Sequence, residues 1–137
     1  MIVRSFKEAR ETSRRITADN WESIRLALGD DELGFSFHIT TMYAKTTTSM
    51  HYKNHIELVY CISGEGELFD VVAGRSYPIA PGTLYILDKN DPHRVTAESD
   101  LVIACVFRPA LQGREVHDAD GAYPLLSAAE AAHSVSR

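Results

Sequence analysis

The 137-residue sequence has little of what marks a secreted, membrane-bound or nucleic-acid-binding protein. Its only cysteines, Cys61 and Cys105, lie inside apolar runs, so buried reduced thiols are expected rather than a disulfide. No run of about 18 apolar residues occurs, and the N-terminus lacks a signal-peptide core, which predicts a cytoplasmic protein without a membrane partner. The formal net charge of −5 argues against nucleic acid as a partner.

Internal repeats, low-complexity tracts and linkers rich in proline, serine or glycine are also missing. Residues 1–125 are therefore expected to form a single domain. The hydrophobic content of 45% and the charged content of 24% are those of an ordinary globular protein with a real core. Residues 126–137 are predicted to be a peripheral tail, either disordered or containing a terminal helix over Ser127–Val135.

What the sequence does contain is a series of short β-rich runs separated by turn residues. Trp21–Leu28 and Phe35–Tyr43 alternate between two faces, which is typical of strands. Ile56–Ile62 and Thr83–Leu87 are apolar runs that flank turns built on glycine and proline. With turns every 8–12 residues, the pattern indicates about seven or eight strands in a β-sandwich or barrel.

Three other segments are assigned from their composition. Leu101–Phe107 is apolar on both faces, so it is expected to be a strand that is buried on both. Lys45–Ser49, with three consecutive threonines, is expected to be an exposed connection, and Phe6–Thr12 a short helix.

Polar residues recur on one face of several predicted strands, opposite an apolar face. Ser23 and Arg25 share a face with Trp21, and Thr40 shares a face with Ser36. A barrel whose interior carries such residues encloses a ligand cavity rather than a packed core. The predicted lining consists of Trp21, Arg25, Thr40, Glu57, Tyr85 and Cys105.

Residues 51–93 concentrate side chains that can bind a metal, and small double-sheet barrels with metal ligands include the cupins. The first cupin motif has a glutamate followed by six residues and a glycine, as in Glu57 and Gly64. The two histidines that normally precede this glutamate are missing. In the second motif Pro81-Gly82 is present, but Tyr85 stands where a histidine is usual, and His93 could supply the imidazole instead.

A closer resemblance rests on five runs that occur in one order. They are IVRSFKEAR, GFSFHITTMYA, HYKNHIELVYCISGEGE, PIAPGTLYILDKNDPH and LVIACVFRPALQGREVHDADGAYPL. From Met1 to about Leu125 the chain closely resembles the ectoine synthase family of compatible-solute biosynthesis. The resemblance implies an all-β, cupin-type double-stranded β-barrel (jelly roll) with a few short helices, and a homodimer.

The resemblance also implies an activity and a metal. The family's hydro-lyases close N-γ-acetyl-2,4-diaminobutyrate into the cyclic amidine ectoine, an osmoprotectant, with loss of water. Glu57, Tyr85 and His93 are implied to bind ferrous iron, Fe(2+). One carboxylate, one phenol and one imidazole suit this ion but also admit Zn or Mn. His55 is not expected to bind the metal itself but to support the ligand Glu57 as a neighbouring polar group.

Other positions are implied to hold the substrate or to move protons. Arg25 is the candidate clamp for the substrate carboxylate, although the residues alone also allow a surface salt bridge. The remaining pocket positions are Trp21 and Phe107 as apolar walls, with Ser23, Thr40, Cys105 and His117. Tyr52 is implied to act as general acid, and Glu115 to accept the amine proton or hold the substrate amide. Which of these two is the acid and which the base stays open.

Two other functions fit the same pattern. One is an iron-dependent dioxygenase, which the missing histidine pair disfavours. The other is a cupin sensor module that binds a small molecule without turnover. In addition, the polar segment from Gly113 to Leu125 is a candidate lid over the cavity.

Overall fold

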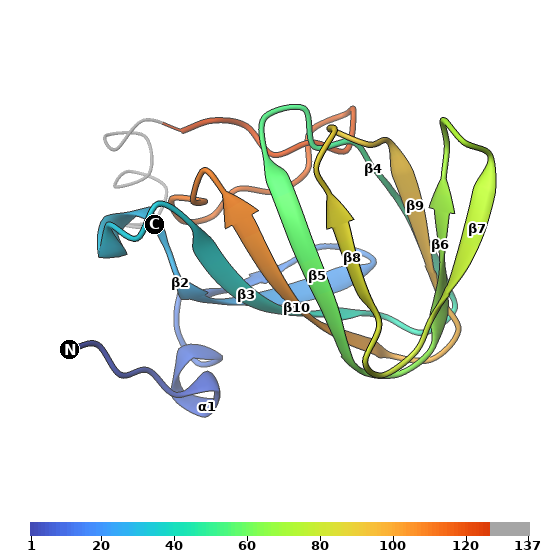
Figure 1. Cartoon of the computed structure of the whole chain (residues 1–137). Coiled ribbons are helices and arrows are strands. Elements are labelled where there is room, and N and C mark those ends of the chain that lie inside the picture. The colour runs from blue at the N-terminus through green and yellow to red at the C-terminus, as the bar shows by residue number, and fades with distance from the viewer. Residues whose placement is uncertain (127–137) are drawn as a thin grey trace.

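The computed structural model of the chain describes residues 1–126, so the predicted helix Ser127–Val135 lies outside the described residues. Residues 1–126 form ten strands, one short α-helix and one 3-10 turn, arranged as two antiparallel sheets (Figure 1). The predicted all-β architecture with few short helices is confirmed. The strand number exceeds the predicted seven or eight because several strands are short.

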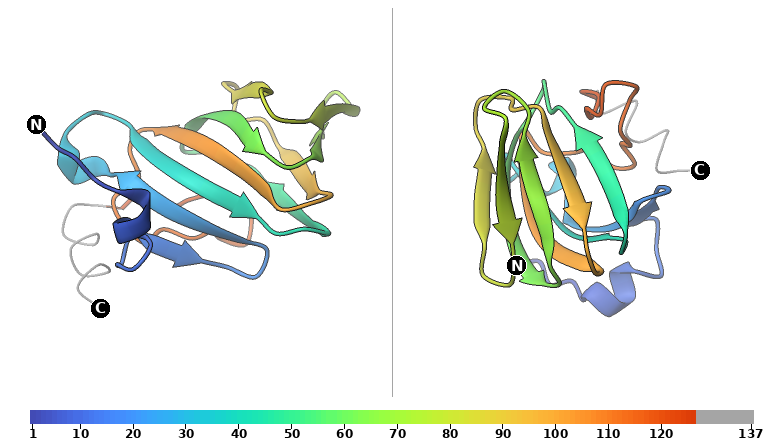
Figure 2. Two further views of the ribbon diagram at one scale, coloured as in Figure 1. Left: turned by 90° about the horizontal axis from the view of Figure 1, so that it is seen from below. Right: turned by 90° about the vertical axis from the view of Figure 1, so that its right-hand side faces the viewer.

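The larger sheet has six strands, and its central strands carry the polar faces seen in the sequence. In spatial order it consists of β1 (Arg15–Thr17), β2 (Trp21–Ala27), β3 (Ser36–Met42), β10 (Leu101–Arg108), β5 (Ile56–Ser63) and β8 (Leu84–Leu87). The smaller sheet consists of β4 (Thr46–Met50), β9 (His93–Ala97), β6 (Gly66–Asp70) and β7 (Arg75–Ile79). The two sheets face each other and enclose the core (Figure 2).

The segment Lys45–Ser49 is not an exposed connection. Its threonines form most of β4, which pairs with β9 so that Thr48 lies opposite Val95 and Met50 opposite His93. Thr48 and Met50 are buried while Thr47 and Ser49 are exposed. The β-branched threonines suit a pleated, half-buried strand, and this preference prevailed over their polarity.

Two predicted elements have different bounds or burial from those expected. The helix α1 covers only Phe6–Ala9, because the Thr12 hydroxyl donates to the Ala9 carbonyl oxygen at 2.7 Å and closes the chain into turns there. The strand β10 is fully buried only on the face of Leu101 and Phe107. Its opposite face is half-buried, because β10 is central within its sheet but the outer face of the sheet is not covered by another layer.

The register of the larger sheet gathers the polar inward residues at one end of the barrel. Arg25 on β2 lies opposite His38 on β3, which in turn lies opposite Cys105 on β10. Phe107 on β10 lies opposite Glu57 on β5. Because side chains alternate along each strand, these residues from separate strands project into one interior region.

The chain after β10 crosses this end of the barrel without forming further strands. The amide of Gly29 donates to the Leu111 carbonyl at 2.8 Å, and the Leu111 amide donates to the Ser36 hydroxyl at 3.0 Å. Further along, the His51 amide donates to the Gly121 carbonyl at 2.9 Å. Within the predicted lid segment, Gly113 to Leu125, the Gly113 carbonyl also accepts from Arg25 at 2.9 Å, and the Tyr123 carbonyl accepts from the Asn54 side chain at 3.0 Å. The segment is thus held at several points in this structure.

Candidate active site

A cavity of about 20 Å³ lies between the two sheets. Its lining residues come from both sheets, from the β4–β5 connection and from the segment after β10: Trp21, Thr40, Met42, Met50, Tyr52, Glu57, Tyr85, Val95, Ile103, Cys105, Phe107, His117 and Tyr123. All but one of the six lining residues predicted from the sequence are among them; Arg25 lies buried beside the cavity instead. The volume suffices for about one water molecule, so a substrate must displace side chains to enter.

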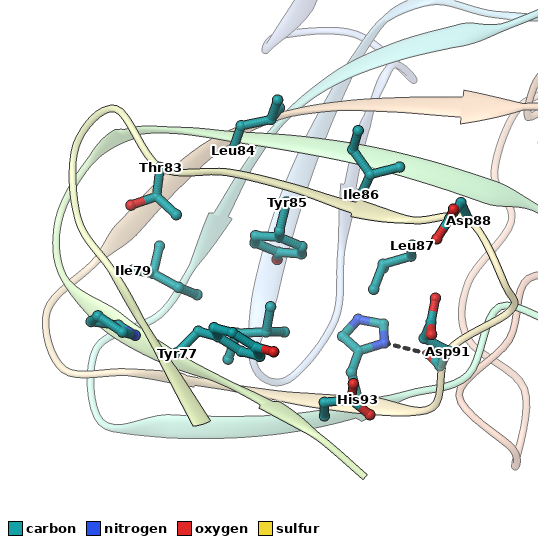
Figure 3. A pocket seen from close by; sticks show the side chains of 13 residues that line it. Tyr77, Ile79, Thr83, Leu84, Tyr85, Ile86, Leu87, Asp88, Asp91 and His93 are labelled. Atoms are coloured by element: carbon teal, nitrogen blue, oxygen red, sulfur yellow. Dashed lines mark hydrogen bonds between the residues drawn. The ribbon is translucent and has the colours of Figure 1, made fainter. Parts of the chain in front are cut away.

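The three candidate metal ligands lie on three strands. Glu57 on β5 and Tyr85 on the neighbouring β8 both face the cavity. His93 begins β9 in the opposite sheet, so it is a strand residue and not the loop histidine that Asp91-Pro92 suggests. Tyr85 and His93 also line an adjoining groove of about 390 Å³, shown in Figure 3. Tyr85 therefore connects the carboxylate side of the site to the imidazole side.

His93 presents the nitrogen that a metal ligand needs. Its Nδ1 lies 2.9 Å from the carbonyl oxygen of Asp91, which must accept the proton of that nitrogen (Figure 3). The Nε2 atom therefore carries a lone pair, and it is buried without a hydrogen-bond partner among residues 1–126. A backbone carbonyl that fixes the tautomer in this way is typical of histidines that bind metals.

Glu57 and Tyr85 carry the oxygen atoms that could bind a metal, and within residues 1–126 no cationic side chain is paired with Glu57. Glu57 is only 5% exposed, and burial raises its pKa to about 8. In the described part of the chain, no lysine, arginine or histidine forms an ion pair with it. Burial also raises the pKa of Tyr85 well above its ordinary value. A bound dication would favour the charged form of both groups, so the donor set fits a divalent metal.

A metal site at this place would need the phenol of Tyr85 as well as the carboxylate and the imidazole. Within residues 1–126, no three side chains of His, Cys, Asp and Glu alone come together in a way that could hold a metal ion. No hydrogen bond joins His55 to Glu57 in the described residues, and the buried Nδ1 of His55 has no partner there, so the predicted support stays a prediction. The ring of His55 lies 5.9 Å from that of Phe107, edge to face. His55 thus contributes to the site by packing.

Arg25 is an unusual cation, because its side chain has no exposed surface. Its Nη1 donates to the carbonyl oxygen of Gly113 at 2.9 Å, while Nε and Nη2 have no partner within residues 1–126. Desolvation lowers its pKa, and Tyr123 and Glu115 partly offset this shift. The surface salt bridge is excluded, and a guanidinium that stays charged with two free donors is suited to hold an anion.

Glu115 is also buried, at 4% exposure, so it is not a surface glutamate. Its two carboxylate oxygens accept hydrogen bonds from the backbone amides of Gln112 and Gly113, both at 2.7 Å. Each oxygen therefore already accepts one hydrogen bond from the chain itself. In this conformation Glu115 holds the turn whose Gly113 carbonyl contacts Arg25.

Tyr52 and His117 form the polar contact inside the cavity. The Tyr52 hydroxyl lies 2.9 Å from Nε2 of His117 and 3.2 Å from the sulfur of Met50. Burial raises the pKa of Tyr52 well above its ordinary value, and burial together with Arg25 lowers the pKa of His117 to about 4. At neutral pH the pair therefore consists of a protonated phenol and an uncharged imidazole.

The other predicted substrate residues lie around this pair. The rings of Trp21 and His117 are 5.3 Å apart, and both also line an outer depression of about 410 Å³. This pair therefore separates the depression from the inner cavity. Thr40 lines the cavity and its hydroxyl donates to that of Ser23 at 3.2 Å; Ser23 is buried behind it.

Tyr123 is the site residue that sequence reasoning missed. Its ring stacks on that of Tyr52, with centroids 5.3 Å apart and planes at 16°. The one available signal was an aromatic residue just before Pro124 in an otherwise polar segment, a pattern that a surface tyrosine shares.

Both cysteines are free and buried, as expected, with Cys105 in the cavity lining. Residues 1–126 include no helix that is both long and apolar enough to cross a membrane.

Comparisons with known proteins agree with each other. The family model described as ectoine synthase matches residues 1–127. The L-ectoine synthase of Vibrio cholerae serotype O1 is 60% identical over 126 residues, which cover 91% of each chain. The L-ectoine synthase of Hahella chejuensis is 58% identical over 125 residues, covering 91% of this chain and 95% of the relative.

An ectoine synthase is also found among the solved structures that this chain resembles. The crystal structure of ectoine synthase from P. lautus superposes with a TM-score of 0.84 at 46% identity, covering 93% of this chain and 91% of that one. A predicted oxalate decarboxylase from Thermotoga maritima has a TM-score of 0.64 at 22% identity, covering 80% of this chain and 99% of that one, which shows a shared fold only. These matches confirm the predicted cupin-type double-stranded β-barrel.

Proposed function

Because the chain belongs to the ectoine synthase family, we propose that it cyclises N-γ-acetyl-L-2,4-diaminobutyrate to ectoine with loss of water. In this hydro-lyase reaction the α-amine attacks the acetamide carbonyl carbon, and a carbon–nitrogen bond forms. The two nitrogens together give up two protons, the carbonyl oxygen takes up two and leaves as water, and a carbon–nitrogen double bond completes the ring. The site must curl the substrate, hold its carboxylate and deliver protons to the departing oxygen.

The observation that carries the proposal is the buried, incompletely bonded guanidinium of Arg25. Its free Nε and Nη2 can donate to the two oxygens of the substrate α-carboxylate as a charge-assisted pair. Such a carboxylate would also relieve the cost of keeping a lone cation in the interior. The apolar rings of Trp21 and Phe107 would then pack on the curled methylene chain and exclude water.

Proton delivery falls to Tyr52. Its phenol is protonated at neutral pH, and after it has donated, a proton released by the substrate amine can return to it through the uncharged imidazole of His117 at 2.9 Å, which takes up one proton and gives up one. Glu115, with both oxygens bonded to backbone amides, is proposed to hold the turn beside Arg25 instead of acting as the base. The acid role thus goes to Tyr52 because its hydroxyl faces the cavity.

Glu57, Tyr85 and His93 are the residues that would hold a ferrous ion, with zinc or manganese as alternatives. A metal bound there would supply Lewis-acid polarisation of the acetamide carbonyl. The chain's own contribution is to keep the Nε2 of His93 unprotonated through Asp91 and to shield Glu57 from solvent.

An anaerobic assay tests this function. Protein stripped of metal is mixed with N-γ-acetyl-2,4-diaminobutyrate, with and without Fe(II), and cyclic product is followed by chromatography. We expect product only when metal is present, without any need for oxygen. Product that requires oxygen would identify a dioxygenase, and substrate binding without product would identify a sensor module.

We further propose that two copies of the chain associate through the outer face of β5 and β8. Five exposed apolar side chains form this face: Leu58, Tyr60, Ile62, Leu84 and Ile86. Tyr60 lies opposite Leu84 and Leu58 opposite Ile86, so the apolar surface is continuous across the two strands. Sedimentation velocity is expected to show a dimer that Leu84→Glu converts to a monomer; a wild-type monomer at high concentration would contradict this.

A further inference from the structure

Tyr123 lies at the centre of the aromatic cluster that closes the cavity, yet the proposed reaction gives it no role. It is 4% exposed. Besides the stack on Tyr52, its ring meets that of Phe107 edge to face at 5.3 Å and 79°, and its centroid is 4.6 Å from that of His117. One ring thus contacts the proposed acid, its hydrogen-bond partner and an apolar wall.

The same ring lies against the buried cation. The Cζ atom of Arg25 is 5.5 Å from the centroid of Tyr123. The guanidinium has one hydrogen bond, to Gly113, and no ion pair within residues 1–126. The electron-rich face of an aromatic ring attracts a cation, and this attraction is strongest where water is excluded. Tyr123 therefore helps to fix the direction in which the free donors of Arg25 point.

The loop that carries Tyr123 is itself firmly bonded. The carboxylate of Asp118 accepts from the amides of Asp120 at 2.9 Å and Ala122 at 3.1 Å. The side-chain amide of Asn54 donates to the Tyr123 carbonyl at 3.0 Å. A ring on such a loop can define the position of its neighbours instead of adapting to them.

We propose that Tyr123 is a positioning residue whose ring sets the orientation of both the Tyr52 phenol and the Arg25 guanidinium for the cyclisation. The inference rests on the proposed function for its kinetic consequences, but the positions of the two side chains are observable without turnover. The ring face of Tyr123 makes both contacts, but its hydroxyl also lies close enough to Arg25 and Tyr52 to act on the pKa of each. It partly offsets the lowering of the pKa that burial causes at Arg25 and adds to the raising that burial causes at Tyr52, so the contribution of the ring has to be separated from that of the hydroxyl.

Two substitutions separate the ring from the hydroxyl. Tyr123→Phe keeps the ring and is expected to leave kcat and KM within about threefold of wild type. Tyr123→Leu removes it, and we expect kcat to fall and KM to rise by about tenfold each, because the stack and the cation contact are lost together. Leu101→Ala serves as the control: Leu101 is fully buried on β10 but does not line the cavity.

The control should lower the melting temperature while kcat and KM stay at wild-type values in folded protein. Tyr123→Leu kinetics that match those of Leu101→Ala would overturn the proposal, since the role would then be structural only. Equal losses in Tyr123→Phe and Tyr123→Leu would also overturn it. In the Arg25→Ala background, Tyr123→Leu is expected to raise KM no further; full additivity would argue against action through Arg25.

A structural measurement keeps this test independent of the proposed function. In NMR spectra the chemical shifts of the Tyr52 ring protons should be alike in wild type and Tyr123→Phe and should change in Tyr123→Leu, because the ring-current contribution of residue 123 is then lost while that of Phe107, 5.1 Å from Tyr52, remains. If wild type makes no ectoine but these shifts behave as expected, the proposed function fails and the positioning role stands. If product forms and the Tyr52 shifts are the same in all three proteins, the positioning role fails alone.

Discussion

Replacing His93 by alanine is expected to abolish tight metal binding, and with it product formation. The same result is expected for Glu57→Ala and Tyr85→Ala, because each would leave two donors in place of three. Loss of a residue that only supports a ligand typically weakens metal affinity 10–100-fold, so loss of a ligand should weaken it by at least about 100-fold. Anaerobic equilibrium dialysis with Fe(II) measures this directly.

Tyr77→Phe is the matched control, because Tyr77 lines the same groove as Tyr85 and His93 but is partly exposed to solvent (Figure 3). It should bind the metal as wild type does. Metal retained at wild-type affinity in all three ligand variants would contradict the assignment of Glu57, Tyr85 and His93.

Metal uptake should also depend on pH. Glu57 must lose its proton to bind a cation, and in the metal-free protein its pKa is raised to about 8 by burial. His93, whose pKa burial lowers, is already neutral near that pH. Binding as two anions releases one proton from Glu57 and one from Tyr85, whose pKa burial raises well above its ordinary value, so the apparent affinity is expected to rise about a hundredfold per pH unit up to about pH 8 and about tenfold per unit above it. A flat profile from about pH 6 to 8 would contradict a buried carboxylate ligand.

The second large effect is expected for Arg25→Met, which should raise KM by at least about 100-fold while metal binding persists. Truncating one partner of a buried, hydrogen-bonded charge pair costs about 2–5 kcal/mol, and about 1.4 kcal/mol corresponds to a tenfold change. In the substrate-free protein, by contrast, the charge of Arg25 is not expected to contribute to stability. There Arg25 is a buried cation with one hydrogen bond, so removing its charge should not lower the melting temperature.

A raised KM together with an unchanged melting temperature would distinguish a role of Arg25 in substrate binding from a structural role. Steady-state kinetics and thermal unfolding of the substrate-free protein measure the two quantities. Arg25→Lys keeps the charge but loses the planar fork, so its KM should lie between those of wild type and Arg25→Met. A variant that melts early with an unchanged KM would identify Arg25 as a structural residue only.

The fold could be predicted from the sequence because a strand produces a recognisable pattern of apolar and polar residues along a short segment. Alternating faces in Trp21–Leu28 and Phe35–Tyr43, and the runs Ile56–Ile62 and Thr83–Leu87, predicted four strands close to their observed bounds. The prediction that Lys45–Ser49 is an exposed connection was wrong for an equally local reason. A strand that buries two of its residues on one side carries too few apolar side chains to be recognised.

The site was accessible only in part, and mainly through family resemblance. Nothing local distinguishes Glu115 from an exposed glutamate, because its burial depends on a turn that folds back onto its own carboxylate. The ring of Tyr123 reaches Tyr52 across 71 positions of sequence, and no periodicity carries such a contact.

By itself, then, the sequence determined the β-barrel and which strand faces turn inward, since side-chain alternation along a strand is a property of neighbouring residues. The resemblance added the reaction and its candidate residues. Only the tertiary structure decided that Arg25 is wholly buried with free donors, that Glu115 is bonded to backbone amides, and that the ring of Tyr123 contacts both Arg25 and Tyr52. These properties arise from packing between segments far apart in the chain, where burial and hydrogen-bond partners are set by the register of the sheets.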